Sequence, residues 1–137
     1  MATDTAGTSA RLLPFQAVHY IRKDITYADD GDTVVVGVLP AGAVIIKAAS
    51  GVNISTAFDG NSSNVLDIGY STDSGTNNLA TQLALGTATF VPLDEATGGN
   101  YMGATTDRTI SALVTSTASA TAGVGQIIIA YIPAART

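Results

Sequence analysis

The alternation of apolar and more polar residues is the feature that most restricts the fold of this chain. Between positions 15 and 22, every second residue belongs to a more apolar set, namely Phe15, Ala17, His19 and Ile21. A period of two is typical of a β-strand, because successive side chains of a strand point to opposite faces of its sheet. The pattern predicts a strand with one face turned towards a core.

Further extended runs follow, and turn-forming residues separate them. We predict strands at residues 33–39, 43–48, 52–56, 65–70, 87–93, 109–115 and 126–132. Clusters of Asp, Gly, Asn and Pro close these runs, for example at 29–32, 40–42 and 59–63, because these residues suit the backbone angles of turns. Gly51 indicates a bulge or bend between two runs. The last run is apolar on both faces, as in a central buried strand.

Residues 77–85 fit two interpretations. Leu79 and Leu83 stand four apart, which suits a short helix, and the same segment equally suits a loop pinned by its leucines. No long amphipathic helix alternates with the predicted strands, so a parallel α/β sheet is not expected. The pattern as a whole predicts an all-β fold, an antiparallel β-sandwich that is jelly-roll-like and has about eight strands.

The chain has 137 residues, the usual size of one domain. Residues 1–12 are rich in Thr, Ala, Ser and Gly, and we expect them to form a flexible N-terminal arm. Residues 13–137 are expected to form a single β-sandwich domain. Hydrophobic residues make up 46% of the chain and charged residues 12%. This composition is not that of a disordered protein, which has low hydrophobicity and many charges. So few charges predict a surface of small uncharged residues, or one covered by partners.

Charge and cysteine content exclude several classes of function. The formal net charge is −5, and the six Lys and Arg residues are scattered along the chain. Binding to nucleic acid or to anionic lipid needs a basic face, so neither partner is expected. The absence of cysteine excludes disulfides and Cys-based zinc sites. No apolar run reaches the ~18 residues of a membrane span, and the N-terminus does not resemble a signal peptide. We expect synthesis in a cytoplasm.

No catalytic apparatus is recognisable in the sequence. The single histidine, His19, lies within a predicted strand, where we interpret it as a partly buried structural residue rather than as the base of a catalytic triad. There is no G-x-S-x-G elbow and no P-loop. The aspartates of residues 29–32, Asp59 and Asp67 suit turns better than a metal site, although a weak calcium site stays open. We therefore expect no enzymatic activity, cofactor or metal.

One stretch of the chain resembles a known family. The motif L-P-A-G-A occupies residues 39–43, V-x-x-x-x-A-F-D-G occupies residues 52–60, and L-D-I-G occupies residues 66–69. This order is similar to that in small structural proteins of tailed-bacteriophage heads. The similarity is closest to the capsid decoration, or cementing, proteins of short-tailed phages, which are jelly rolls. It covers about residues 33–75 well.

The resemblance implies a structural virion protein on the capsid exterior. Such a protein would bind the phage major capsid protein and cement neighbouring copies of it, as a homo-oligomer (dimer or trimer) made in the host cytoplasm. Arg11, Leu12 and Leu13 are the candidate partner-binding residues, since an arm can order on its partner; they equally suit a simple lead into the first strand. The alternative is a carbohydrate- or host-binding module of a phage tail or fibre, because lectins share the sandwich class.

Overall fold

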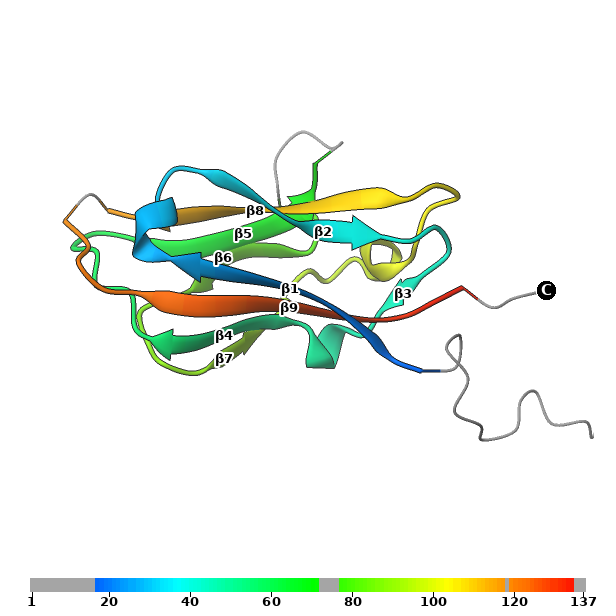
Figure 1. The fold of residues 1–137 in the computed structure, drawn as a ribbon, viewed down its shortest axis with the longest axis horizontal. Coiled ribbons are helices and arrows are strands. Elements are labelled where there is room, and N and C mark those ends of the chain that lie inside the picture. Colours follow the sequence, from blue (N-terminus) through cyan, green and yellow to red (C-terminus); the bar gives the residue numbers. More distant parts are fainter. Residues whose placement is uncertain (1–16, 72–76, 118, 135–137) are drawn as a thin grey trace, which may run out of the picture.

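The computed structural model describes residues 17–71, 77–117 and 119–134. These residues form nine strands that run along the long axis of the molecule (Figure 1). The strands are β1 (His19–Thr26), β2 (Thr33–Leu39), β3 (Val44–Ile45), β4 (Gly51–Thr56), β5 (Asn64–Tyr70), β6 (Ala80–Ala84), β7 (Phe90–Pro92), β8 (Arg108–Ser116) and β9 (Val124–Ile132). Helical structure in this part of the chain is limited to the short 3-10 turns η2 (Tyr27–Asp29), η3 (Lys47–Ala49) and η4 (Gly98–Tyr101).

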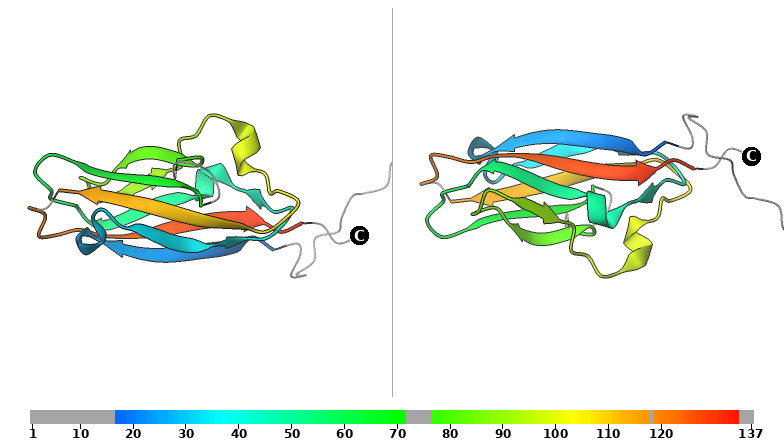
Figure 2. Two further views of the ribbon diagram at one scale, coloured as in Figure 1. Left: turned by 90° about the horizontal axis from the view of Figure 1, so that it is seen from above. Right: turned by 90° about the horizontal axis from the view of Figure 1, so that it is seen from below.

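The strands form two antiparallel sheets, ordered β1-β9-β4-β7 and β2-β8-β5-β6, with β3 paired to β9. Strands from the first half of the chain pair with strands from the second half: β1 with β9, β2 with β8, β4 with β7 and β5 with β6. The topology is therefore one long hairpin of eight strands rolled into two layers, which is a jelly-roll-like sandwich. In Figure 2, the left view shows the molecule from the side of β8 and the right view shows it from the side of β9. The predicted all-β sandwich is confirmed. The short strand β3 lies outside the rolled hairpin, and β6 is the strand that was not predicted.

The core lies between the two layers. Leu66, Ile68 and Tyr70 of β5 face Ile127 and Ile129 of β9 across it, and all five side chains are fully buried. Burial of each such side chain contributes about 1.5–3 kcal/mol. The prediction that the last run is a central strand is confirmed, because β9 pairs with β1 on one side and with β4 and β3 on the other. Its second apolar face, however, points away from the core.

The expectation of a helix or loop at residues 77–85 is wrong, because β6 lies there. One residue of β5, Asp67, lies opposite two residues of β6, Thr81 and Gln82. This bulge adds one residue to β6. The apolar residues before and after the bulge are therefore more than two positions apart in sequence, and their spacing resembles that of a helix. Gln82 adopts a positive φ of 51°. Its backbone N–H donates to Asp67 Oδ1 at 2.8 Å, and that of Thr81 donates to Asp94 Oδ1 at 2.9 Å.

Two other predicted runs are shorter in the structure. Of residues 43–48 only Val44 and Ile45 pair as a strand, and the chain then bends through η3 just before Gly51. The bulge of β4 lies further on, between Ile54 and Thr56. Of residues 87–93 only β7 is extended and paired. The described residues contain no helix that is long and apolar enough to cross a membrane.

Candidate docking surface

Each of the four edge strands in the described part of the chain carries a feature that disfavours pairing with a further strand. β7 has only three residues and ends at Pro92. β6 and β2 are bulged. β1 carries the exposed Lys23 between Ile21 and Ile25, on the core-facing side of its alternation. Short, bulged edges and edges with Pro or Lys are how β proteins avoid edge-to-edge association. A partner is therefore expected to dock on a sheet face or on loops.

Three residues of β1 and three of β9 lie in register on the outer side of the sheet. On β1, Tyr20, Arg22 and Asp24 point away from the core, and in register opposite them on β9 lie Ala130, Ile128 and Gln126. We call these six residues the β1–β9 face. Tyr20 exposes 57% of its surface, Ile128 is half-buried and Ala130 is fully buried. A tyrosine this exposed, next to aliphatic residues of a central strand, is typical of a surface that a partner covers.

Further apolar residues extend this patch. Ile132 at the end of β9 exposes 47% of its surface and lies opposite Val44 of β3, which exposes 43%. Phe90 of β7 lies opposite Asn53 of β4, on the same side of the sheet, and is also exposed. Single exposed apolar residues need no explanation, but a contiguous group of them marks an interaction site.

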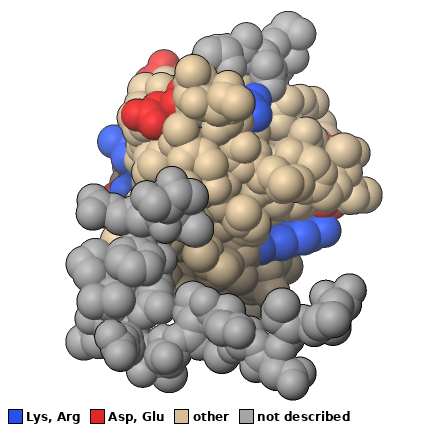
Figure 3. Space-filling model, turned by 90° about the vertical axis from the view of Figure 1, so that its right-hand side faces the viewer, with Lys and Arg blue, Asp and Glu red and all other residues tan. Residues whose placement is uncertain are grey.

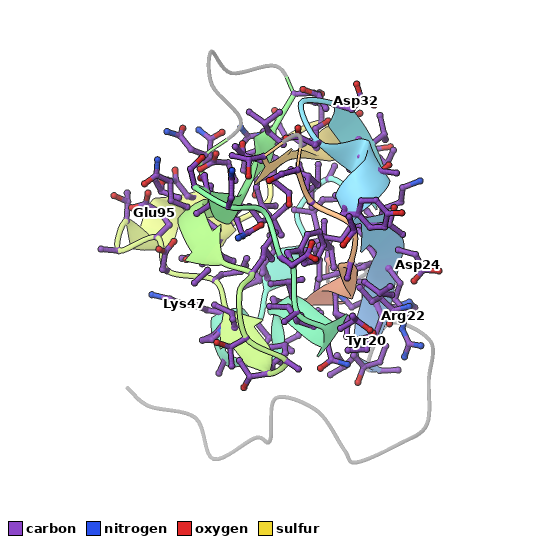
Figure 4. All side chains as sticks on the ribbon, turned by 90° about the vertical axis from the view of Figure 1, so that its left-hand side faces the viewer. Tyr20, Arg22, Asp24, Asp32, Lys47 and Glu95 are labelled. Atoms are coloured by element: carbon purple, nitrogen blue, oxygen red, sulfur yellow. The ribbon has the colours of Figure 1, made fainter. Side chains whose placement is uncertain are left out.

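The β1–β9 face also carries ordered polar groups. The guanidinium carbon of Arg22 lies 5.6 Å from the ring centroid of Tyr20, within the range of a cation–π contact. The side-chain amide of Gln126 donates a hydrogen bond to Asp24 Oδ1 at 2.9 Å. Tyr20, Arg22 and Asp24 project from β1 on one side of the molecule (Figure 4). Tyr and Arg are the residues most enriched where binding energy concentrates.

The loops at one end of the sandwich are tied to one another by hydrogen bonds. Asp59, in the β4–β5 loop, accepts from the backbone N–H groups of Thr121 and Ala122 at 2.7 and 2.9 Å and from the Thr121 hydroxyl at 2.8 Å. These donors, the Ala122 N–H foremost, hold the pKa of Asp59 below its usual range. Asp30, in the β1–β2 loop, accepts from the Ser116 N–H at 2.8 Å. Both aspartates lie in loops, as predicted, but these hydrogen bonds come from distant segments of the chain and not from the backbone of their own turns.

The opposite end is built around a buried tyrosine. Tyr101 of η4 donates its hydroxyl hydrogen bond to the Glu95 carbonyl at 2.7 Å, and burial raises the pKa of this tyrosine. Lys47 donates to the same carbonyl at 2.9 Å and lies 5.5 Å from the Tyr101 ring centroid. The backbone N–H of Thr97 lowers the pKa of the Glu95 carboxyl. Charged side chains are sparse on the visible described part of this end (Figure 3), which gives a partner little basis for charge recognition.

His19 of β1 packs against an aromatic ring of the neighbouring strand. It is half-buried and stacks on Tyr131 of β9, its partner in register, with ring centroids 5.6 Å apart and an interplanar angle of 30°. Across the described ranges, no three His, Asp or Glu side chains gather closely enough to hold a metal ion. Asp59 and Asp67, two of the aspartates considered for a weak calcium site, each accept a backbone hydrogen bond.

The predicted partner-binding residues Arg11, Leu12 and Leu13 lie outside the described residues. Sequence reasoning did not select the β1–β9 face, although one signal was present. Tyr20 and Arg22 fall on the more polar side of the first alternating run, which is the outward side. Their grouping with Ile128 depends on the pairing of β1 with β9, more than 100 residues further along the chain, and no local pattern indicates that pairing.

Comparisons with solved structures define the fold further. A chain of the cyanophage Pam1 capsid asymmetric unit is similar, with 20% identity and a TM-score of 0.58 over 97% of this chain and 98% of that chain. A chain of the capsid of Ralstonia phage GP4 has 21% identity and a TM-score of 0.60 over 99% and 91%. A chain of the acid-stable capsid of Helicobacter pylori bacteriophage KHP30 has 13% identity and a TM-score of 0.54 over 88% and 90%.

At these identities the likeness shows a shared fold. It extends over almost the whole length of both chains in each pair, so the matched chains are also similar in size to this one. No protein-family model and no curated protein matches this sequence.

Proposed function

We propose that this chain is a structural protein of a tailed-bacteriophage virion that binds the outer surface of the capsid and cements contacts between copies of the major capsid protein. One observation carries the proposal: three chains with this fold, each matched over nearly its full length, come from phage capsids. The motif order within residues 39–69 points to the same class of protein.

The surface of the domain is compatible with this function. Its edges disfavour strand addition, and the outer side of its first sheet exposes Tyr20, Phe90 and Ile132. A capsid repeats each binding site many times, so a protein that contacts two or more capsid subunits gains affinity through multivalency. Binding and mechanical bridging need no catalytic group, and the one histidine of the sequence, His19, stacks on Tyr131.

The direct test uses heads of the encoding phage that were produced without this gene. Purified chain is added to unexpanded and to expanded heads, and the bound stoichiometry and the temperature at which heads release DNA are measured. We expect saturable binding with a fixed number of copies per head and an increase in the release temperature. Absence of binding to heads in both maturation states would reject the proposal.

The N-terminal residues give a second, separate test of the capsid contact. We predict that the double substitution Leu12→Ser and Leu13→Ser weakens head binding, because it removes the apolar anchor of the proposed arm. The far-ultraviolet circular dichroism of the variant should remain that of the wild type. Unchanged affinity would limit the contact to the folded domain. A glycan array separates the alternative function, since a carbohydrate-binding module would bind sugars and not heads.

A further inference from the structure

The β1–β9 face has a charge pattern that is complementary to itself. Arg22 and Asp24 are two positions apart on β1 and point to the same side of the sheet, which places them ~7 Å apart along the strand. A two-fold axis that passes above β1 at the level of Lys23, parallel to the sheet and perpendicular to the strand, places Arg22 of one copy opposite Asp24 of the other. Isologous interfaces are built from such reciprocal pairs.

We infer that two copies of this chain associate face to face through their β1–β9 faces, with Arg22 of each copy paired to Asp24 of the other. The inference concerns the purified chain and does not depend on the proposed function. In this arrangement the two β1 strands run antiparallel, and the two outer sheet surfaces pack with the small inclination usual for aligned sheets.

The apolar residues of the face would contribute the free energy of association that the ion pairs do not provide. Exposed ion pairs contribute little by themselves, about 0–1 kcal/mol, and each copy carries a net charge of −5, which opposes association. Tyr20 and Ile128 lie around the charged pair and would lose their contact with water in the dimer. The eight paired positions of β1 and β9 make this surface about 26 Å long, and the exposed Val44, Ile132 and Phe90 widen it on the same side of the sheet.

A second copy suits this face better than an unrelated partner does. The crossed pairing matches both charges of Arg22 and Asp24 with no further residue, and the two pairs lie on either side of the two-fold axis. The blunted edge of β1, with Lys23 on its core-facing side, disfavours a dimer made by extending the sheet. Face-to-face packing avoids that edge.

The test exchanges the two charges separately and together. By light scattering after size exclusion, the wild type should have about twice the 13.8 kDa mass of one chain. Arg22→Asp and Asp24→Arg should each raise the dimer dissociation constant by roughly 100-fold or more, because each places like charges in contact. A one-to-one mixture of the two variants should regain the dimer, since both crossed pairs are then of opposite charge. The double variant R22D/D24R should regain it for the same reason.

Controls separate this interface from a folding effect. Lys23→Glu changes a charge at the same level of β1 but on the other side of the strand, and it should leave the dimer intact. Tyr20→Ala should weaken the dimer without changing the melting curve of the monomer. A monomeric wild type, single exchanges that stay dimeric, or a mixture that fails to reassociate would each overturn the inference. Head binding is measured independently, so a monomer that still binds heads would leave the proposed function standing.

Discussion

Ser50 shows how a single polar side chain completes a β-ladder. On one side β9 pairs with β4 up to Ile128 and with β3 from Tyr131, and Ala130 lies between these two partners. There the Ala130 N–H donates to Ser50 Oγ at 2.9 Å, and the Ala130 carbonyl accepts from the Ile46 N–H at 2.8 Å. Ser50 is fully buried. Its hydroxyl therefore takes the place that a backbone carbonyl would occupy in a continuous sheet.

We predict that Ser50→Ala lowers the free energy of unfolding by about 1–3 kcal/mol, because the buried Ala130 N–H is left without an acceptor. Urea unfolding followed by circular dichroism measures this change. Ser55→Ala is the matched control, since the Ser55 hydroxyl is exposed and donates to the Val124 carbonyl at 3.2 Å. The control should stay within ~0.5 kcal/mol of the wild type, and equal losses in both variants would contradict this account.

Asp59 predicts how stability depends on pH. The backbone and hydroxyl donors of residues 121–122 hold its folded-state pKa below the ordinary value of 3.8. A carboxyl with a depressed folded pKa stabilises the protein fully above its unfolded pKa, and the contribution is lost as the pH falls through the folded pKa. Asp59→Asn should therefore lower the melting temperature near neutral pH, and the difference from the wild type should shrink below pH ~4. A difference that persists undiminished at low pH would show that the charge is not involved.

At the scale of an element, the close approach of β4 and β7 depends on Gly51. A Cβ atom at Gly51 would meet the Val91 carbonyl oxygen and lie 2.7 Å from Pro92 Cα. We predict that Gly51→Ala costs about 1–3 kcal/mol through overpacking and separates β7 from the sheet. Amide hydrogen exchange should then accelerate at Leu93, whose N–H donates to the Ser50 carbonyl. Gly86→Ala is the control, because nothing lies within 4 Å of the added carbon.

The elements that the sequence predicts best are those whose pattern is purely local. Residues 33–39 form a run rich in β-branched residues between two turn clusters, and β2 has these bounds. β6 was missed because its bulge is stabilised from outside the segment, by Asp67 of β5 and Asp94 of the β7–β8 connection. A carboxylate that satisfies a distant N–H leaves no signature in the spacing of Leu79 and Leu83. Tertiary hydrogen bonds, rather than propensity, determined that strand.

At the scale of the whole molecule, only part of the β1–β9 face could be predicted from the sequence. The composition predicts a weakly charged surface suited to a partner, and the alternation predicts which side of β1 faces outward. The β1–β9 face exists only because Tyr20 pairs with Ala130 and Arg22 with Ile128. The rolled hairpin brings the first strand, β1, next to the last strand, β9. A surface made of residues from both strands therefore depends on the topology, and neither segment alone predicts it.

The sheet edges give a prediction for the molecule as a whole. β1 is the longest edge strand of its sheet, and Lys23 is the charge that interrupts the apolar side formed by Ile21 and Ile25. We predict that Lys23→Ile leaves the fold intact but makes the purified protein aggregate, because an inward-pointing charge at an edge is a principal barrier to further strand pairing. Light scattering over time measures this, with Lys23→Glu as the charged control that should stay soluble. If the isoleucine variant shows no added association at equal concentration, another part of the molecule protects this edge.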